Sequence, residues 1–273
     1  MTTAKTIRVG LIGSGAAAGQ HVRALAALDG VRIVGVAGRT RDKAAALLAT
    51  GGAVASTATI YADAAAMLDT ERPDVVFVAV PPHLAGDACR LVIERGLPFL
   101  VEKPLAADAQ TPLELAAEIR RRDLIVAVGY QWRGIDFLPE VRRRLAGRPP
   151  RLVVARWMGD TPPPEWWRHV ADGGGQIVEQ ATHLYDVARL LLGEARVVAA
   201  RIARHKRPAY PDANVADVGA ALLEFESGAI GSFANTCLLA SSLVEIEFAS
   251  EGLRTSIRLG GDWPYVTWTV RLE

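Results

Sequence analysis

The sequence predicts an α/β protein of two domains. A doubly wound parallel sheet is expected in residues 1–128, and an α+β domain with an open, largely antiparallel sheet in residues 129–273. Three observations indicate this: a glycine-rich turn between the first strand and the first helix, an alternation of apolar strands with helical segments up to residue 128, and a run of strand-like segments after residue 195. A chain of 273 residues is long enough for two ordinary cores.

The glycine-rich turn follows a strand at residues 7–12 and opens a helical pattern that continues to about residue 28. It has the Gly-x-Gly-x-x-Ala spacing of the dinucleotide-binding fingerprint, in which the first glycine permits a tight turn and the second lets the backbone approach a pyrophosphate. The helix N-terminus then offers N–H groups to the phosphates. We assign five residues of this turn to a cofactor site: Gly13, Ser14, Gly15, Ala16 and Ala17.

The end of the second strand, residues 31–37, bears on the type of cofactor. An NAD site needs an acid here for the adenosine ribose 2′-hydroxyl, and no acid occurs before Asp42. Arg39 and the Thr40 hydroxyl would instead bind a 2′-phosphate. The sequence therefore favours NADP(H) over NAD(H). The alternative is that Arg39 and Arg41 only open the next helix on a solvated face.

Two later strands, at residues 75–80 and 97–101, stop at residues that can reach a ligand. In an open parallel sheet, ligands bind beyond the carboxyl ends of the strands. The alternative is that Lys103 is a solvated charge and His83 an exposed loop residue. We assign the residues at these two strand ends to the cofactor site: Pro81, Pro82, His83, Glu102 and Lys103.

A proline-rich segment at residues 159–168 cannot form regular structure, and it carries the adjacent Trp166 and Trp167. Two exposed tryptophans in a loop are costly, so they either pack the loop down or line a pocket. We treat this segment, including Arg168, as a candidate source of substrate specificity.

A helical pattern spans residues 176–192, after three consecutive glycines. Glu179 and His183 are embedded in its mostly apolar face at i, i+4 spacing, which places them on one side of a helix. An acid one turn from a histidine can orient the ring, and this suits a general acid/base. The alternatives are a purely structural pair or a metal site. Because no third ligand lies nearby, we predict no metal.

Beyond this helix the sequence alternates like the strands of an antiparallel sheet, and Ser227-Gly228 is typical of a hairpin turn. A strand is also expected before the helix, at residues 152–157. The expected later strands are residues 196–203, 218–226, 230–235, 243–249, 255–259 and 265–272.

The composition excludes several classes of protein. Half of the residues are hydrophobic and the net charge is +1, which gives no electrostatic case for nucleic acid or an anionic membrane. Cys89 and Cys237 are too few for a disulfide framework or a thiolate metal site. No apolar run reaches the roughly 18 residues that a membrane span needs, and a strand begins almost at once, so no signal peptide is expected. The cytoplasm is the predicted location.

Three motifs occur in one order: the glycine turn, Glu102-Lys103-Pro104, and a glycine-opened helix carrying Glu179, His183 and Asp186. With them the chain resembles the Gfo/Idh/MocA oxidoreductases, the glucose–fructose oxidoreductase and inositol dehydrogenase family, over nearly its whole length. The resemblance implies an NAD(P)-binding Rossmann domain and a second domain whose open sheet forms a homodimer or homotetramer. It also implies a nicotinamide lying over the Glu102–Pro104 segment, with a cis bond at Lys103-Pro104.

The resemblance also assigns roles to residues. The family's catalytic lysine corresponds to Lys103 and its histidine to His183, while Glu179 stands where the family usually has an aspartate, one methylene shorter. The motifs at residues 129–133 and 166–168 are similar to those of dehydrogenases of sugars or related polyols, which adds Gln131 to the cofactor site. The implied substrate-binding residues are Lys103, Tyr130, Trp166, Trp167, Arg168, Glu179 and His183.

The expected activity is hydride transfer between nicotinamide C4 and a secondary alcohol or ketone of a sugar, a polyol or a related small molecule. Two alternatives remain, an NAD-dependent glycoside hydrolase and a non-catalytic nucleotide-sensing regulator. Family members usually continue past the position of Glu273 and return a helix to the nucleotide domain. We expect this segment to be missing here, either because the sequence is trimmed or because this member lacks the helix.

Overall fold

The computed structural model describes residues 5–261 and 267–273. The chain divides into two compact units, Met1–Gly129 and Tyr130–Glu273. Each unit has its own buried apolar cores and is described by itself. No helix in the described part of the chain is long and apolar enough to cross a membrane.

The first unit is built on a sheet of six parallel strands in the order β3-β2-β1-β4-β5-β6. The order reverses between β1 and β4, which is the arrangement of dinucleotide-binding sheets and confirms the predicted doubly wound domain. The short β3 was not expected, because three residues are too few to show a periodicity. The strands are β1 (Ile7–Ile12), β2 (Val31–Ala37), β3 (Thr59–Tyr61), β4 (Val75–Val78), β5 (Phe99–Val101) and β6 (Val126–Val128).

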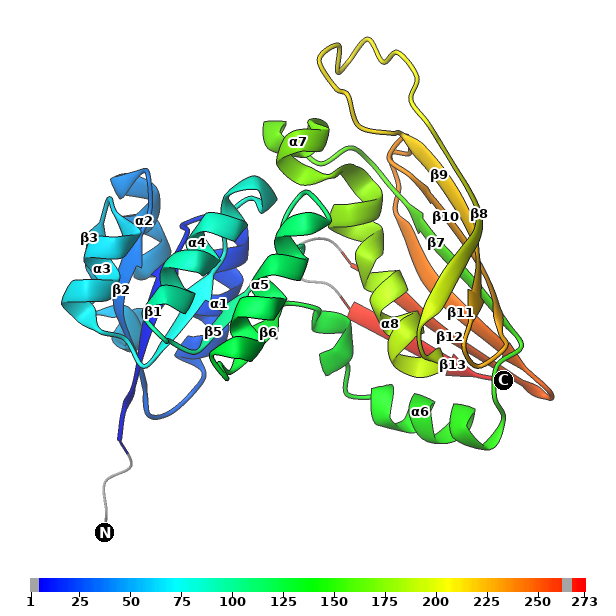
Figure 1. Ribbon diagram of the computed structural model, residues 1–273, viewed down its shortest axis with the longest axis horizontal. Helices are drawn as coiled ribbons and strands as arrows, with labels where there is room; N and C mark the ends of the chain where they lie inside the picture. The colour runs from blue at the N-terminus through cyan, green and yellow to red at the C-terminus, as the bar shows by residue number, and fades with distance from the viewer. Residues whose placement is uncertain (1–4, 262–266) are drawn as a thin grey trace. The chain divides into compact units, whose positions relative to one another are not determined.

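Helices cover both faces of this sheet (Figure 1). The two faces bury separate apolar clusters, one with side chains of the first two helices and one with side chains of the next three. Since both faces are covered, a strand in the middle of the sheet can be apolar along its whole length, as β4 is. The helices are α1 (Ala16–Ala26), α2 (Arg41–Ala49), α3 (Ala64–Glu71), α4 (Pro82–Glu94) and α5 (Gln110–Arg121).

The second unit contains a seven-stranded sheet in the order β13-β12-β11-β7-β10-β9-β8. All neighbouring strands are antiparallel except β7 and β10, which run parallel, so the sheet is largely antiparallel as predicted. Residues 265 and 266 of the last expected strand lie outside the described residues. The strands are β7 (Leu152–Met158), β8 (Ala195–Ala203), β9 (Val218–Phe225), β10 (Ile230–Thr236), β11 (Leu243–Ser250), β12 (Leu253–Gly260) and β13 (Thr267–Leu272).

One face of this sheet packs against α6 (Leu138–Gly147) and α8 (Thr182–Leu192), and α8 lies along it in Figure 1. Phe233, Ile246 and other alternate residues of the strands point into this core. Their neighbours on the opposite face stay accessible, as the burial pattern of β9 and β10 shows. The sheet is therefore open on one side.

The helix expected at residues 176–192 is not a uniform α-helix. Gly174 and Gly175 adopt positive φ angles of 73° and 78° after a short helix, α7 (Val170–Gly173). A π-helical turn, Ile177–Ala181, then leads into α8. Because a π-turn bonds i to i+5, the i, i+4 rule that predicted a shared side for Glu179 and His183 does not apply across it.

Candidate functional site

The glycine-rich loop has the geometry that the fingerprint requires. Gly13 has φ of +113°, and an added Cβ would lie 2.1 Å from the Ala79 carbonyl oxygen, so only glycine fits between β1 and β4. Gly15 precedes α1 without a side-chain cap, and nothing lies within 4 Å of the position of its missing Cβ. Ala18 is fully buried between helix and sheet. The open space at Gly15 and the uncapped N–H groups of α1 fit a pyrophosphate.

The two glycines are expected to respond differently to alanine. Gly13→Ala should lower the free energy of unfolding by about 3 kcal/mol, because a Cβ collides with backbone at a strained φ. Gly15→Ala should change stability by less than about 0.5 kcal/mol, yet raise the nucleotide Kd about tenfold by filling the open space. Urea unfolding and nucleotide titration of both variants measure this. Equal stability losses would contradict the assignment.

The end of β2 lies beside this loop. An added Cβ on Gly38 would approach Ser14 Oγ to 2.8 Å, so the two turns are in close contact. Arg39 and Thr40 follow as exposed residues, and Thr40 precedes α2 in an extended conformation. Arg39 makes no ion pair with any residue that the structure describes. Its guanidinium is thus available at the position where the adenosine ribose is expected.

The residues after β4 form the start of a helix rather than a loop. Pro81 occupies the N-cap position of α4, Pro82 its first helical position, and His83 is exposed in its first turn. The helix begins at Pro82, because proline is favoured at the first helical position. All three residues remain at the carboxyl edge of the sheet.

The segment after β5 carries Glu102 and Lys103. The Lys103-Pro104 bond is cis, as the resemblance implies. Glu102 Oε1 accepts a hydrogen bond from His21 Nε2 at 2.9 Å, and Glu102 Oε2 accepts one from the Lys103 amide at 3.2 Å. Lys103 is half-buried and follows the strand next to β4, so it lies on the same edge of the sheet as the glycine loop.

In the second unit, His183 is enclosed by aromatic rings. It is 2% exposed in the first turn of α8. The indoles of Trp132 and Trp157 lie nearly parallel to its ring, with centroids 6.4 and 6.0 Å away, and Tyr130 meets it edge-on at 5.9 Å. The imidazole orientation is therefore fixed by packing, which favours a defined role in proton exchange.

Hydrogen bonds from the 130–134 segment hold the start of α8. The Tyr130 hydroxyl lies 3.0 Å from Thr182 Oγ1. Arg133 donates two hydrogen bonds, of 2.8 and 2.5 Å, to the buried carboxylate of Asp186 one turn beyond His183. Gln131 is exposed at the start of the same segment. The Arg133–Asp186 pair is bidentate and thus fixes both distance and orientation.

Glu179, in the π-turn, accepts a hydrogen bond from Trp167 Nε1 at 2.9 Å. Trp167 is 1% exposed and packs with Val215 and Cys237, so it holds the proline-rich loop down against the unit. Trp166 is half-buried against Gly173. Of the two alternatives expected for this loop, Trp167 therefore follows the first, in which the tryptophan packs the loop against the protein.

Arg168 belongs to a second set of contacts, since its guanidinium lies 5.4 Å from the ring centroid of Tyr210. Arg207 stacks on the same ring at 5.0 Å. Arg168 therefore connects the loop that precedes α7 to the segment between β8 and β9, to which both Tyr210 and Arg207 belong.

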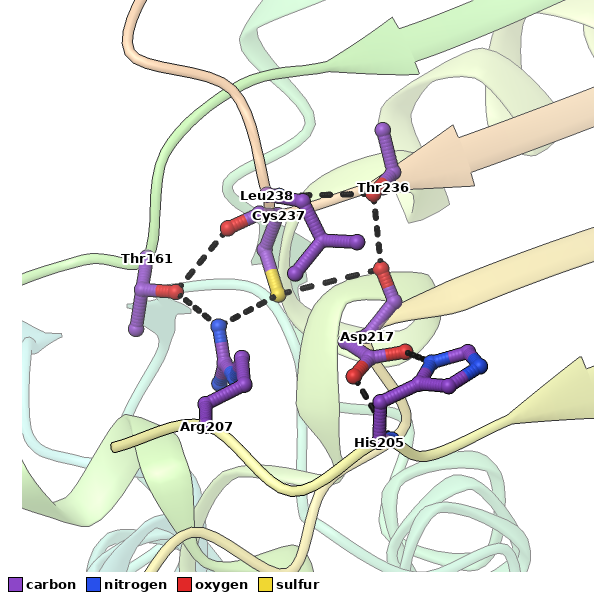
Figure 2. Close-up of polar contacts among 7 residues, drawn as sticks. All are labelled: Thr161, His205, Arg207, Asp217, Thr236, Cys237 and Leu238. Carbon is purple, nitrogen blue, oxygen red and sulfur yellow. Dashed lines mark hydrogen bonds and ion pairs between the residues drawn. The ribbon is translucent and has the colours of Figure 1, made fainter. Parts of the chain in front are cut away.

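A polar cluster that the sequence did not indicate anchors that segment (Figure 2). Arg207 donates to Thr161 Oγ1 at 2.6 Å and contacts Cys237 Sγ at 3.5 Å. The buried Asp217 carboxylate accepts hydrogen bonds from the His205 ring and amide at 2.9 and 2.8 Å. Burial raises the pKa of Asp217, but these bonds and the charge of Arg207 outweigh it and hold the pKa below its usual value. The cluster stabilises the surroundings of Trp167.

The described residues contain no group of three or more His, Cys, Asp or Glu side chains placed to hold a metal ion. Both cysteines are buried thiols. Burial raises the pKa of Cys89 to about 12, which disfavours its thiolate form.

Together, the strand order and the glycine loop define a protein with an NAD-binding Rossmann fold. Residues 7–130 match the family described as "Oxidoreductase family, NAD-binding Rossmann fold", and residues 147–252 match the "GFO/IDH/MocA C-terminal domain". The chain belongs to the Gfo/Idh/MocA oxidoreductase family, as the resemblance of its motifs indicated.

Two curated relatives are similar in sequence. The rhizopine catabolism protein MocA of Rhizobium meliloti is 31% identical over 194 residues, which are 68% of this chain and 57% of that protein. Inositol 2-dehydrogenase 1 of Saccharopolyspora erythraea is 28% identical over 226 residues, 82% of this chain and 65% of that one. The chain thus spans less than two thirds of the length of these relatives.

Two solved structures share the fold. GenD2 from gentamicin A biosynthesis, in complex with NAD, aligns with a TM-score of 0.82 and 23% identity over 95% of this chain and 74% of that one. KijD10, a 3-ketoreductase from Actinomadura kijaniata in complex with NADP, aligns with a TM-score of 0.82 and 21% identity over 97% and 84%. At these identities the likeness concerns the fold alone.

Proposed function

We propose that the protein is an NAD(P)-dependent dehydrogenase or reductase that acts on a CH–OH group of a sugar, a polyol or a related small molecule. The single observation that carries this proposal is the placement of Lys103 on the carboxyl edge of the sheet that bears the glycine loop. Membership of the oxidoreductase family and the names of the relatives, which include inositol 2-dehydrogenases, support the reaction type.

In the proposed reaction the bound cofactor supplies the hydride chemistry at nicotinamide C4. Lys103, as an ammonium group, hydrogen-bonds the substrate oxygen and stabilises developing alkoxide charge. His183 exchanges the hydroxyl proton, with its ring orientation held by Trp132 and Trp157. Glu179 binds a neighbouring hydroxyl or orients His183, while its Oε2 is held by Trp167.

A screen of sugars and polyols tests this proposal. With NADP⁺ or NAD⁺ present, a substrate should produce reduced nicotinamide, measured by its near-ultraviolet absorbance. Sugar release without net reduction would indicate the glycoside hydrolase instead, because that enzyme recycles its cofactor. Nucleotide binding with no turnover on any sugar or polyol would indicate the regulator.

We further propose that NADP(H) is preferred over NAD(H), with Arg39 binding the 2′-phosphate. Removing a hydrogen bond to a charged group costs about 1.5–3 kcal/mol, so Arg39→Ala should raise the KM for NADP⁺ about 10- to 100-fold and leave the KM for NAD⁺ nearly unchanged. The matched control is Arg41→Ala, two residues on in the first turn of α2. Equal effects on both cofactors would contradict the assignment.

The open face of the seven-stranded sheet is the proposed interface of a homodimer or homotetramer. Leu152 and Ile230 are register partners on this face and are 43% and 50% exposed. Leu222 on the next strand is 40% exposed. These exposed apolar side chains support the proposal, because apolar patches on a protein surface are typical of interaction sites.

Ile230→Glu should therefore shift the sedimentation coefficient of the oligomer to that of a monomer. The matched control is Ile125→Glu, which alters a 79% exposed side chain in the first unit. A monomeric unsubstituted protein would refute the interface.

A further inference from the structure

A histidine outside the assigned site residues contacts the Glu102–Lys103 segment. His21 lies in α1, one and a half turns after the glycine loop, and donates from Nε2 to Glu102 Oε1 at 2.9 Å. The two side chains are only 17% and 22% exposed. The bond joins positions 81 residues apart in the chain.

The other carboxylate oxygen of Glu102 faces the lysine segment. Oε2 accepts a hydrogen bond from the backbone amide of Lys103 at 3.2 Å. Gly129, just after β6, leaves room for this carboxylate, since a Cβ there would lie 3.0 Å from Oε2. The Glu102 carboxylate is thus hydrogen-bonded to His21 of α1, and it lies close to the backbone of Gly129 at the end of β6.

The position of His21 is itself fixed. Its ring meets Phe77 of β4 edge-on, with centroids 5.1 Å apart and planes at 65°. Rotation of the imidazole away from Glu102 would remove this contact as well as the hydrogen bond. The imidazole therefore presents Nε2 in a defined direction.

We propose that His21 is a positioning residue for Lys103, acting through the Glu102 carboxylate. This inference rests on the proposed function, in which Lys103 stabilises the alkoxide. Without His21, one oxygen of a half-buried carboxylate loses its donor, and Glu102 turns toward water and away from the Lys103 amide. The ammonium group then loses its alignment, and a displacement of about 1 Å can cost about 100-fold in rate.

The same contact connects the cofactor loop to the lysine. Helix α1 begins at Ala16, immediately after the loop proposed to bind the pyrophosphate. The hydrogen bond from His21 to Glu102 therefore ties the helix that follows this loop to the segment that carries Lys103. Glu102, assigned from the sequence to the cofactor site, has its carboxylate directed to groups of the protein itself. We expect its substitution to affect kcat more than cofactor affinity.

Three variants test the proposal on the full chain. His21→Leu should lower kcat about 10- to 100-fold and change the cofactor Kd less than about threefold. His21→Gln keeps an N–H donor at a similar reach and should restore most of the rate. Arg23→Gln, an exposed change in the same helix, is the matched control and should behave like the unsubstituted protein. A His21→Leu enzyme with unchanged kcat would overturn the proposal.

A double-mutant cycle separates positioning from a general structural role. In a Lys103→Met background, His21→Leu should cost no further rate, because its effect passes through Lys103. If the double variant instead loses rate by the product of the two single-variant losses, the proposal is refuted. A fall in cofactor affinity equal to the fall in kcat would also refute it.

Hydrogen exchange gives a readout that needs no substrate. His21→Leu should speed amide exchange in the peptide that contains Lys103, and His21→Gln should restore its protection. Unchanged protection would overturn the positioning role even if no sugar or polyol is turned over. Absence of turnover on any sugar or polyol would refute the proposed function but not the positioning role. The exchange measurement therefore distinguishes failure of the positioning proposal from failure of the proposed function.

Discussion

Lys103→Met is expected to lower kcat about 10³-fold while the cofactor Kd changes less than about threefold. Methionine keeps the length and the apolar stem of lysine but removes the charge that stabilises a developing alkoxide. The residue follows β5, on the same edge of the sheet as the cofactor loop but outside that loop. Steady-state kinetics with the substrate found in the screen, together with nucleotide titration, measure the two effects separately.

Lys43→Met is the matched control, because Lys43 is exposed on α2 and has no assigned role. It should leave kcat, Kd and the thermal midpoint unchanged. Undiminished turnover by the Lys103 variant would remove this residue from the reaction. A rise in the cofactor Kd together with a fall in kcat would make it a cofactor ligand instead.

His183→Asn is expected to lower kcat about 10²- to 10⁴-fold, the range typical of a lost general acid or base. Asparagine is polar and smaller than histidine but cannot exchange a proton near neutral pH. The side chain is buried beside Tyr130, Trp132 and Trp157, so the substitution also removes ring contacts. Urea unfolding of the variant must accompany the kinetics.

A catalytic role for His183 predicts that the limb of the pH–rate profile that reports the base disappears in the variant, and a packing role alone does not. His205→Asn serves as the control, because His205 is an exposed histidine of the same unit with a carboxylate partner, Asp217. If both variants retain the profile of the unsubstituted enzyme, the base is another residue.

The features that the sequence predicted correctly depend on local backbone requirements. Gly13 needs a positive φ and has no room for a Cβ, and a strand followed at once by a glycine-rich turn and a helix has few alternative structures. The Lys103–Pro104 segment was placed by the abrupt end of an apolar strand. In both cases the residues that carry the sequence pattern and the backbone feature that they predict lie within about ten residues of each other.

The features that the sequence did not predict depend on contacts between distant segments. Nothing near His21 indicates that Glu102 is its partner, and nothing near Trp167 indicates a bond to Glu179. The π-turn was missed for a related reason. It changes the helical repeat for one turn only, and the apolar periodicity on either side continues as in an ordinary helix.

The parallel pairing of β7 with β10 has a consequence for how the second unit folds. β7 is made first of the seven strands, yet its two neighbours, β10 and β11, follow about 80 to 90 residues later along the chain. Closing such long loops is entropically costly, and sheets rich in distant pairings form slowly. During synthesis β7 therefore has neither partner until β10 has been made, and one of its edges stays unpaired until β11 follows. In that interval β7 can associate with other unfinished chains.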